Sequence, residues 1–191
     1  MKKTLFLLLL SVLAGCLSPV GDDVNYHTID YLPQAAVRSA APKYGALRIS
    51  QILVRPPFDR AEFVVLRGNG TVAFDPCNEF AATPSLLLRG PVFDALNSSS
   101  IAAAVVGSGS LVRASRNAEI LVTRLCLDCT KAGERTAVAE LAVRIVGDGE
   151  IVSIGKGAAN ISAADGDYSR AFSQAVSAAL EKAINSLVTN R

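Results

Sequence analysis

The stretch ERTAVAELAVRIVGDGEIVSIGKGAAN, from Glu134 to Asn160, decides the fold that this sequence adopts. Residues that alternate between two faces are typical of β-strands, and Gly147-Asp148-Gly149 has the composition of a tight turn. The pattern predicts an antiparallel hairpin with strands Glu134–Val146 and Ile151–Asn160. One face of the first strand is wholly apolar, so another element must cover it; this face carries Ala137, Ala139, Leu141, Val143 and Ile145.

The segment after the hairpin is the expected cover. From Tyr168 to about Val188, apolar residues recur at intervals of three and four, which is the pattern of an amphipathic helix. Asp167 can cap the first turn of this helix. Its apolar stripe consists of Phe172, Ala175, Val176, Ala179, Leu180, Ala183, Ile184 and Leu187. We expect the helix to lie over one face of the sheet.

Further strands are expected before the hairpin. A first strand starts at Tyr26 and ends before Pro33, and the others are Ala46–Val54, Glu62–Arg67, Thr71–Phe74, Ala102–Val106 and Ala118–Leu127. Gly68-Asn69-Gly70 predicts a hairpin turn, because Asn-Gly accepts positive φ at low cost.

One irregular helix is expected among these strands. Thr83 can cap it, with Pro84 at the first helical position, and Ser98–Ser100 ends it. Pro91 predicts a kink or a split, because proline inside a helix removes a hydrogen bond and clashes with the preceding turn. The fold class is therefore α+β, with an antiparallel or mixed β-sheet layered with one irregular helix and a long C-terminal amphipathic helix.

The N-terminus has the order of a secretory signal peptide in residues 1–15: two lysines, a short apolar run and small residues. The run is too short to span a membrane, which takes roughly twenty residues. Leu13-Ala14-Gly15-Cys16 resembles the bacterial lipoprotein box. The resemblance implies cleavage before Cys16, diacylglycerol on its sulfur, and a further acyl chain such as palmitate on its new amino group.

A lipidated Cys16 would be a lasting membrane anchor, because two acyl signals already bind stably. Leu17 follows it. In enterobacterial-type cells an aspartate at that position retains a lipoprotein in the inner membrane, so Leu17 favours the outer membrane, facing the periplasm. Residues 16–24 are predicted to be a lipidated tether. Residues 25–191 are predicted to be a single periplasmic domain.

Charge excludes one class of partner. The chain has 19 basic and 17 acidic residues, and removal of Lys2 and Lys3 with the signal peptide leaves 17 of each. Proteins that bind nucleic acid need a basic face, so nucleic acid is not an expected partner.

Three cysteines remain once Cys16 carries lipid. We favour a disulfide between Cys77 and either Cys126 or Cys129, since the regions around them resemble loop edges in an oxidising compartment. Cys126 and Cys129 could pair with each other only if the chain turned between them. Three free thiols are the remaining alternative. A zinc site is not expected, because the chain has one histidine and no second cysteine pair.

Enzyme motifs are not found in the sequence. His27 is the one histidine, and no G-x-S-x-G surrounds any serine. Gly107-Ser108-Gly109-Ser110 lacks the lysine and the helix of a phosphate-binding loop. We therefore expect no catalytic residue, no cofactor and no metal.

Phe58 lies in a loop between a double proline and a charged pair, Asp59-Arg60. An aromatic residue in such a loop can contact a partner or lipid, or it can close the end of the core, and both interpretations stay open. Phe58 and Arg60 are the candidate partner contacts.

Three places resemble the ABC-type transport auxiliary lipoprotein family, the PqiC/YmbA-like group. Tyr26-His27-Thr28-Ile29-Asp30 is similar to its opening strand, and the segment from Pro56 to Arg60 with Phe63–Arg67 is similar to its proline-aromatic turn and next strand. The final hairpin and Ala-rich helix match its ending. Phe80-Ala81 stands where the family often has tryptophan.

The resemblance implies a non-catalytic domain anchored to the outer membrane. It would work with an ABC transporter, which hydrolyses ATP, and with a mammalian-cell-entry (MCE) protein, and together they move lipids between membranes. The symmetry of such partner complexes is compatible with a homo-oligomer of this chain. The alternative is a lipoprotein that assembles another envelope system, such as lipopolysaccharide export or surface-organelle secretion.

Overall fold

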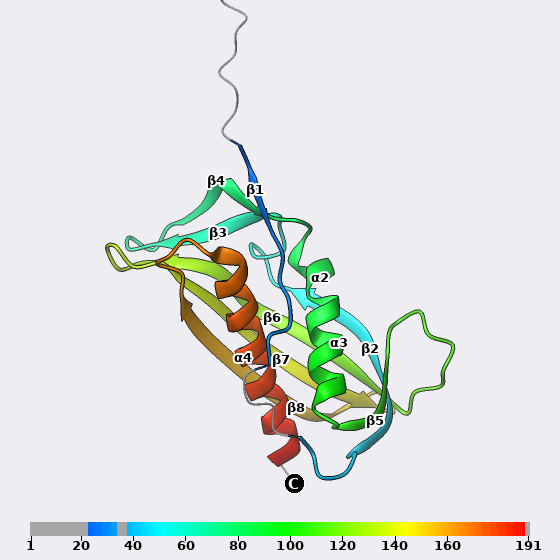
Figure 1. The fold of residues 1–191 in the computed structure, drawn as a ribbon. Helices are drawn as coiled ribbons and strands as arrows, with labels where there is room; N and C mark the ends of the chain where they lie inside the picture. Colours follow the sequence, from blue (N-terminus) through cyan, green and yellow to red (C-terminus); the bar gives the residue numbers. More distant parts are fainter. Residues whose placement is uncertain (1–22, 34–37, 190–191) are drawn as a thin grey trace, which may run out of the picture.

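The computed structural model describes residues 23–33 and 38–189, which form one mixed β-sheet with helices on one face (Figure 1). The predicted α+β fold class is confirmed. The predicted signal peptide and the lipid attachment site, Cys16, lie outside the described residues.

Three long strands form one side of the sheet, with β8 at its edge: β6 (Arg116–Cys129), β7 (Thr136–Gly147) and β8 (Glu150–Ser162). β7 pairs antiparallel with both neighbours. Gly147 pairs with Glu150, and the two residues between them have positive φ, 54° at Asp148 and 82° at Gly149. The predicted hairpin and its turn are therefore confirmed.

The far edge of β6 is shared by two parallel strands. Its first half pairs with β2 (Tyr44–Val54), and its last three residues pair with β3 (Glu62–Arg67). β5 (Ala102–Val106) runs parallel to β2 on its outer edge. β4 (Val72–Phe80) forms the predicted hairpin with β3. The sheet is therefore mixed, with β6 in contact with three other strands.

Helix α4 (Tyr168–Thr189) lies across β7 and β8, as its apolar stripe predicts (Figure 1). Its first turn is capped by Asp167, whose Oδ1 accepts a hydrogen bond from the Arg170 N–H at 3.1 Å. The helix approaches β8 at Gly155 and Gly157. A Cβ on either glycine would overlap a backbone carbonyl of α4, that of Ala183 or Ala179. Glycine is therefore required at both positions.

The predicted irregular helix is two helices, α2 (Pro84–Leu87) and α3 (Arg89–Ser98), which meet at Leu88. The break places Pro91 in the first turn of α3. A proline there costs no hydrogen bond, because the first N–H groups of a helix have no partner within it. Of the two outcomes expected for Pro91, the structure has the split.

The prediction of a first strand from Tyr26 up to Pro33 is wrong beyond His27. β1 is Asn25–His27, parallel to β4, and the chain then leaves the sheet and runs along α4. The N–H groups of Asp30 and Leu32 donate to the hydroxyls of Ser173 and Ser177 at 2.9 and 2.8 Å. Two extended residues and one helical turn both span roughly 6 Å, so these spacings match.

The core lies between α4 and the sheet, and aromatic rings close it at one end. Phe63 of β3, Phe80 of β4 and Phe172 of α4 are all buried. The ring centroid of Phe63 is 4.5 Å from that of Phe80 and 5.0 Å from that of Phe172. These contacts attach the β3–β4 hairpin to α4.

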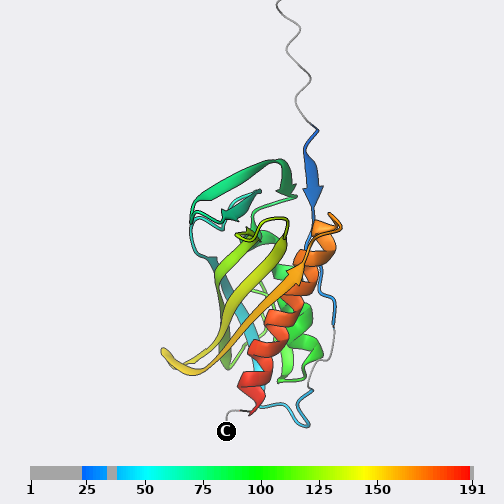
Figure 2. The same cartoon turned by 90° about the vertical axis from the view of Figure 1, so that its left-hand side faces the viewer.

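The opposite face of the sheet is covered by no helix of the described residues (Figure 2). From Ile154 to Asn160 it carries the even-numbered residues of β8, because the odd-numbered Gly155 and Gly157 face α4. Within residues 23–33 and 38–189, no helix is both long and apolar enough to cross a bilayer.

We predict that Gly157→Ala lowers the free energy of unfolding by about 3 kcal/mol, because the added methyl must displace the backbone of α4. Urea unfolding followed by circular dichroism measures the change. Gly90→Ala is the matched control. A Cβ at Gly90 meets nothing within 4 Å, so this variant should be at least as stable as the wild type. Equal stability of the two variants would contradict the close packing of α4 on β8.

Candidate binding surface

The predicted contact loop is a turn that joins β2 to β3. Within the turn, the Phe58 N–H donates to the Arg55 carbonyl at 2.9 Å. Asp59 Oδ1 accepts a hydrogen bond from the Ser85 N–H of α2 at 3.0 Å. The Phe58 ring is half-buried and packs against two clusters, the main core and a small one formed by Val64, Cys126 and Val138. This packing favours the interpretation of Phe58 as closing the end of the core.

Arg60 is held by two neighbours. Its guanidinium pairs with both carboxylate oxygens of Glu62, at 3.0 and 2.7 Å, and lies 3.7 Å from the centroid of the Phe74 ring. The hydrogen bonds from Arg60 lower the pKa of the Glu62 carboxyl. Phe74 is 43% exposed, so the stacked Arg60 and Phe74 present a fixed, partly apolar surface on the β3–β4 hairpin.

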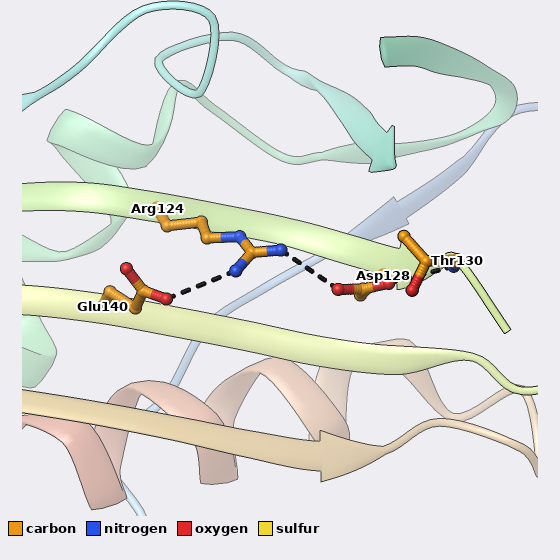
Figure 3. Close-up of polar contacts among 4 residues, drawn as sticks. All are labelled: Arg124, Asp128, Thr130 and Glu140. Carbon is orange, nitrogen blue, oxygen red and sulfur yellow. Dashed lines mark hydrogen bonds and ion pairs between the residues drawn. The ribbon is translucent and has the colours of Figure 1, made fainter. Parts of the chain in front are cut away.

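A polar network lies on the uncovered face (Figure 3). Arg124 of β6 donates to Asp128 Oδ2 at 3.0 Å and to Glu140 Oε1 of β7 at 3.3 Å, and the Thr130 N–H donates to Asp128 Oδ1 at 2.9 Å. The hydrogen bonds from Thr130, followed by the charge of Arg124, lower the pKa of Asp128. The network connects the end of β6 to Thr130, which follows the strand, and to Glu140 of β7.

Sequence reasoning missed this network. Arg124 follows an irregularity in the β6–β7 register, between Val122 and Arg124. Simple alternation counted from the start of β6 assigns residues beyond that point to the wrong face. The partner strand supplies the missing signal, because Glu140 is its charged residue opposite Arg124.

The structure does not form the predicted disulfide between Cys77 and Cys126 or Cys129, and all three are free. Cys77 is on β4, whereas the other two are on β6, and β3 lies between these strands. Two strand spacings amount to roughly 9.5 Å, which exceeds the roughly 7 Å that a disulfide allows between Cα atoms.

The three thiols differ in environment. Cys126 is buried between Val64 and Val138, and burial raises its pKa to about 11. Cys129 is half-buried, and burial raises its pKa as well. Cys77 is half-buried at the irregular part of β4.

His27 ties three elements together. Its Nδ1 is 3.1 Å from Ser169 Oγ of α4, and its Nε2 is 3.0 Å from Asn78 Oδ1 of β4. The imidazole also packs 5.0 Å from the Phe63 ring. A Ser-His pair can act as nucleophile and base, but a neutral amide lacks the charge by which a carboxylate stabilises an imidazolium. The contacts of His27 therefore indicate a structural role, in which it links β1 to α4. Within the described residues, no group of three or more His, Cys, Asp or Glu could hold a metal ion.

Comparison with known proteins gives structural relatives only. No protein-family model matches the sequence, and no curated protein matches it. The crystal structure of protein XCC0632 from Xanthomonas campestris, a DUF330 protein, aligns with a TM-score of 0.66 at 18% identity and covers 86% of this chain and 95% of its own. The chain therefore has the fold of a DUF330 protein.

Two further structures align. A protein described as uncharacterized gives a TM-score of 0.59 at 14% identity, covering 83% of this chain and 96% of its own. A dodecamer of PelC from Paraburkholderia phytofirmans gives 0.45 at 12%, covering 84% and 95%, and at that TM-score the likeness supports no conclusion about this chain.

We predict that Asp128→Asn destabilises the protein at pH 7 by about 1 kcal/mol and that the difference from the wild type shrinks as the pH falls toward 3. A lowered pKa in the folded state stabilises the fold above the ordinary carboxyl pKa of about 4, and this contribution is lost on acidification. Urea midpoints across this pH range measure the effect. Glu150→Gln, at an exposed carboxylate that forms no ion pair with the described part of the chain, is the control and should show a small difference. A pH-independent difference for Asp128→Asn would contradict the role of its charge.

We predict three free thiols in the denatured, unreduced protein, in addition to the modified Cys16. In the folded protein at pH 8, iodoacetamide should modify Cys126 last, because a thiol with a pKa of about 11 is ionised in roughly one molecule per thousand and is buried. Mass spectrometry of the peptides counts the modified thiols. A single free thiol in the denatured sample would contradict this prediction and would indicate a disulfide between two of the three cysteines.

Proposed function

We propose that this chain is a PqiC-type auxiliary lipoprotein, anchored to the outer membrane through Cys16 and facing the periplasm. The observation that carries the proposal is the alignment with a DUF330 protein over 86% of the chain, because the PqiC/YmbA-like group is the DUF330 family. The lipoprotein box at Leu13–Cys16 supports the same role from the sequence alone.

In this role the domain docks an MCE protein of an ABC transporter that moves lipids between membranes. It has no catalytic part, and its partner hydrolyses ATP. The docking surface we propose is the β3–β4 hairpin with the adjoining turn, where Arg60 is stacked on the exposed Phe74 ring. Aromatic and arginine side chains dominate the energetics of many protein interfaces, and both are already fixed here.

The test is a chemical cross-link in intact cells, followed by solubilisation of the membranes and purification of the chain with its partners. We predict that an MCE protein is recovered with the wild-type chain. Arg60→Ala should reduce the recovery several-fold, while Arg113→Ala, at an exposed arginine on the β5–β6 loop, should not change it. The apparent mass of the cross-linked chain alone reports self-association in the same experiment.

Cys16→Ser tests the anchor in parallel. This variant should be absent from the outer membrane and lose the partner, because it has no thiol for lipid attachment. Recovery of an outer-membrane barrel instead of an MCE protein would favour assembly of another envelope system. Recovery of neither partner by the wild-type chain would refute the proposed function.

A further inference from the structure

The uncovered face of the sheet contains a groove of about 610 Å³ between β6, β7, β8 and the end of β2. Ligand sites typically measure roughly 300–1,000 Å³, so a small molecule fits. The groove lies on the opposite side of the sheet from α4, away from the buried core.

The floor of the groove is apolar. Leu121 of β6 pairs with Ala142 of β7, and Ile154 of β8 lies in the next row, 41% exposed. Leu53 of β2 pairs with Leu121 and is 48% exposed, so it extends the apolar surface beyond the groove. Apolar side chains that remain this exposed within one hollow suggest a cover of similar polarity.

Three cations line the same groove: Arg55 at the end of β2, Arg144 of β7 and Lys156 of β8. None of them forms an ion pair within residues 23–33 and 38–189. The carboxylate that lines the groove, Glu140, is paired with Arg124. Glu119 lies opposite Arg144 in register but makes no ion pair with it. Among the described residues, the unpaired cations of the groove therefore outnumber the unpaired carboxylates beside them.

We propose that this groove binds an anionic amphiphile, with its acyl chain over Leu121, Ala142 and Ile154 and its headgroup paired with the cations. Arginine and lysine bind phosphate and carboxylate groups strongly where water is partly excluded. The alternating rows of the sheet place the cations beside the apolar floor, which matches a ligand with a charged head and an apolar tail.

Two lipids share this chemistry, a phospholipid with an anionic headgroup and a free fatty acid. The inference goes beyond the docking role proposed above, and it does not depend on that role because the groove is formed by one chain.

The experiment places the photoreactive residue p-benzoylphenylalanine at Ile154 in the full chain, expressed and irradiated in cells. Mass spectrometry of the peptide that contains position 154 then separates any adduct from the lipid on Cys16. We expect an acyl adduct. A mass that includes phosphate identifies a phospholipid, and an acyl mass without phosphate identifies a fatty acid.

Ile151 is the matched control position, because it lies on the same strand, is 51% exposed and does not line the groove. We expect about tenfold less lipid adduct there. Combining Arg144→Gln with Lys156→Gln should lower the adduct at position 154 about tenfold, since hydrogen bonds to charged groups are lost. Arg113→Gln with Arg170→Gln removes two exposed charges outside the groove and should leave the yield unchanged.

Equal lipid adducts at positions 151 and 154 would overturn the proposal, because they would indicate contact with any nearby membrane. The absence of a lipid adduct, or a protein adduct in its place, would also overturn it. Thermal melts of the charge variants establish that a lower yield does not come from unfolding. Failure to recover an MCE protein leaves this result intact, so the two proposals fail separately.

Discussion

The structure depends on the direct contact between the backbone of α4 and the backbone of β8. Gly155 and Gly157 make this contact possible, because any side chain there would overlap the carbonyls of Ala183 and Ala179. With the helix this close, the small residues of its stripe that face β8, such as Ala179 and Ala183, are fully buried. The same helix binds the backbone of Asp30 and Leu32 through Ser173 and Ser177, so segments from the two ends of the domain stabilise one another.

One consequence is that the sheet has two chemically different faces. The covered face consists of aliphatic and aromatic side chains. The other face has no helix over it and is exposed to solvent, so it also carries charged side chains. These charged residues are of two kinds. Arg124 is neutralised by Asp128 and Glu140, which stabilises the far end of β6. Arg55, Arg144 and Lys156 are not neutralised within the described residues, and they surround the apolar floor of the groove.

Much of the fold could be predicted from local patterns. The β7–β8 hairpin, α4 and its Asp167 cap follow from periodicity and turn chemistry, and Pro91 predicts the break between α2 and α3. The parallel pairing of β6 with both β2 and β3 could not be predicted, because non-local pairing leaves no local pattern. The end of β1 at His27 was missed for a similar reason. The N–H groups of Asp30 and Leu32 donate to Ser173 and Ser177 of α4, whereas in a longer β1 they would have donated to a neighbouring strand. For the candidate site, the sequence identified the loop but not the contacts of its side chains. Phe58 packs against the core, and Arg60 is held by Glu62 and Phe74.

The attachment of residues 28–33 to α4 also limits how far the domain can move under the proposed anchor. A chain gains at most about 3.5 Å per residue, so residues 16–24 span roughly 30 Å when fully extended. From β1 onward the chain is fixed by hydrogen bonds to β4 and α4, and no further slack is added. A domain on such a tether stays near the membrane surface, and its partner must reach it there. Helix α4 therefore has two roles under the proposed anchor: it covers the core through β8, and it limits the reach of the domain by holding Asp30 and Leu32.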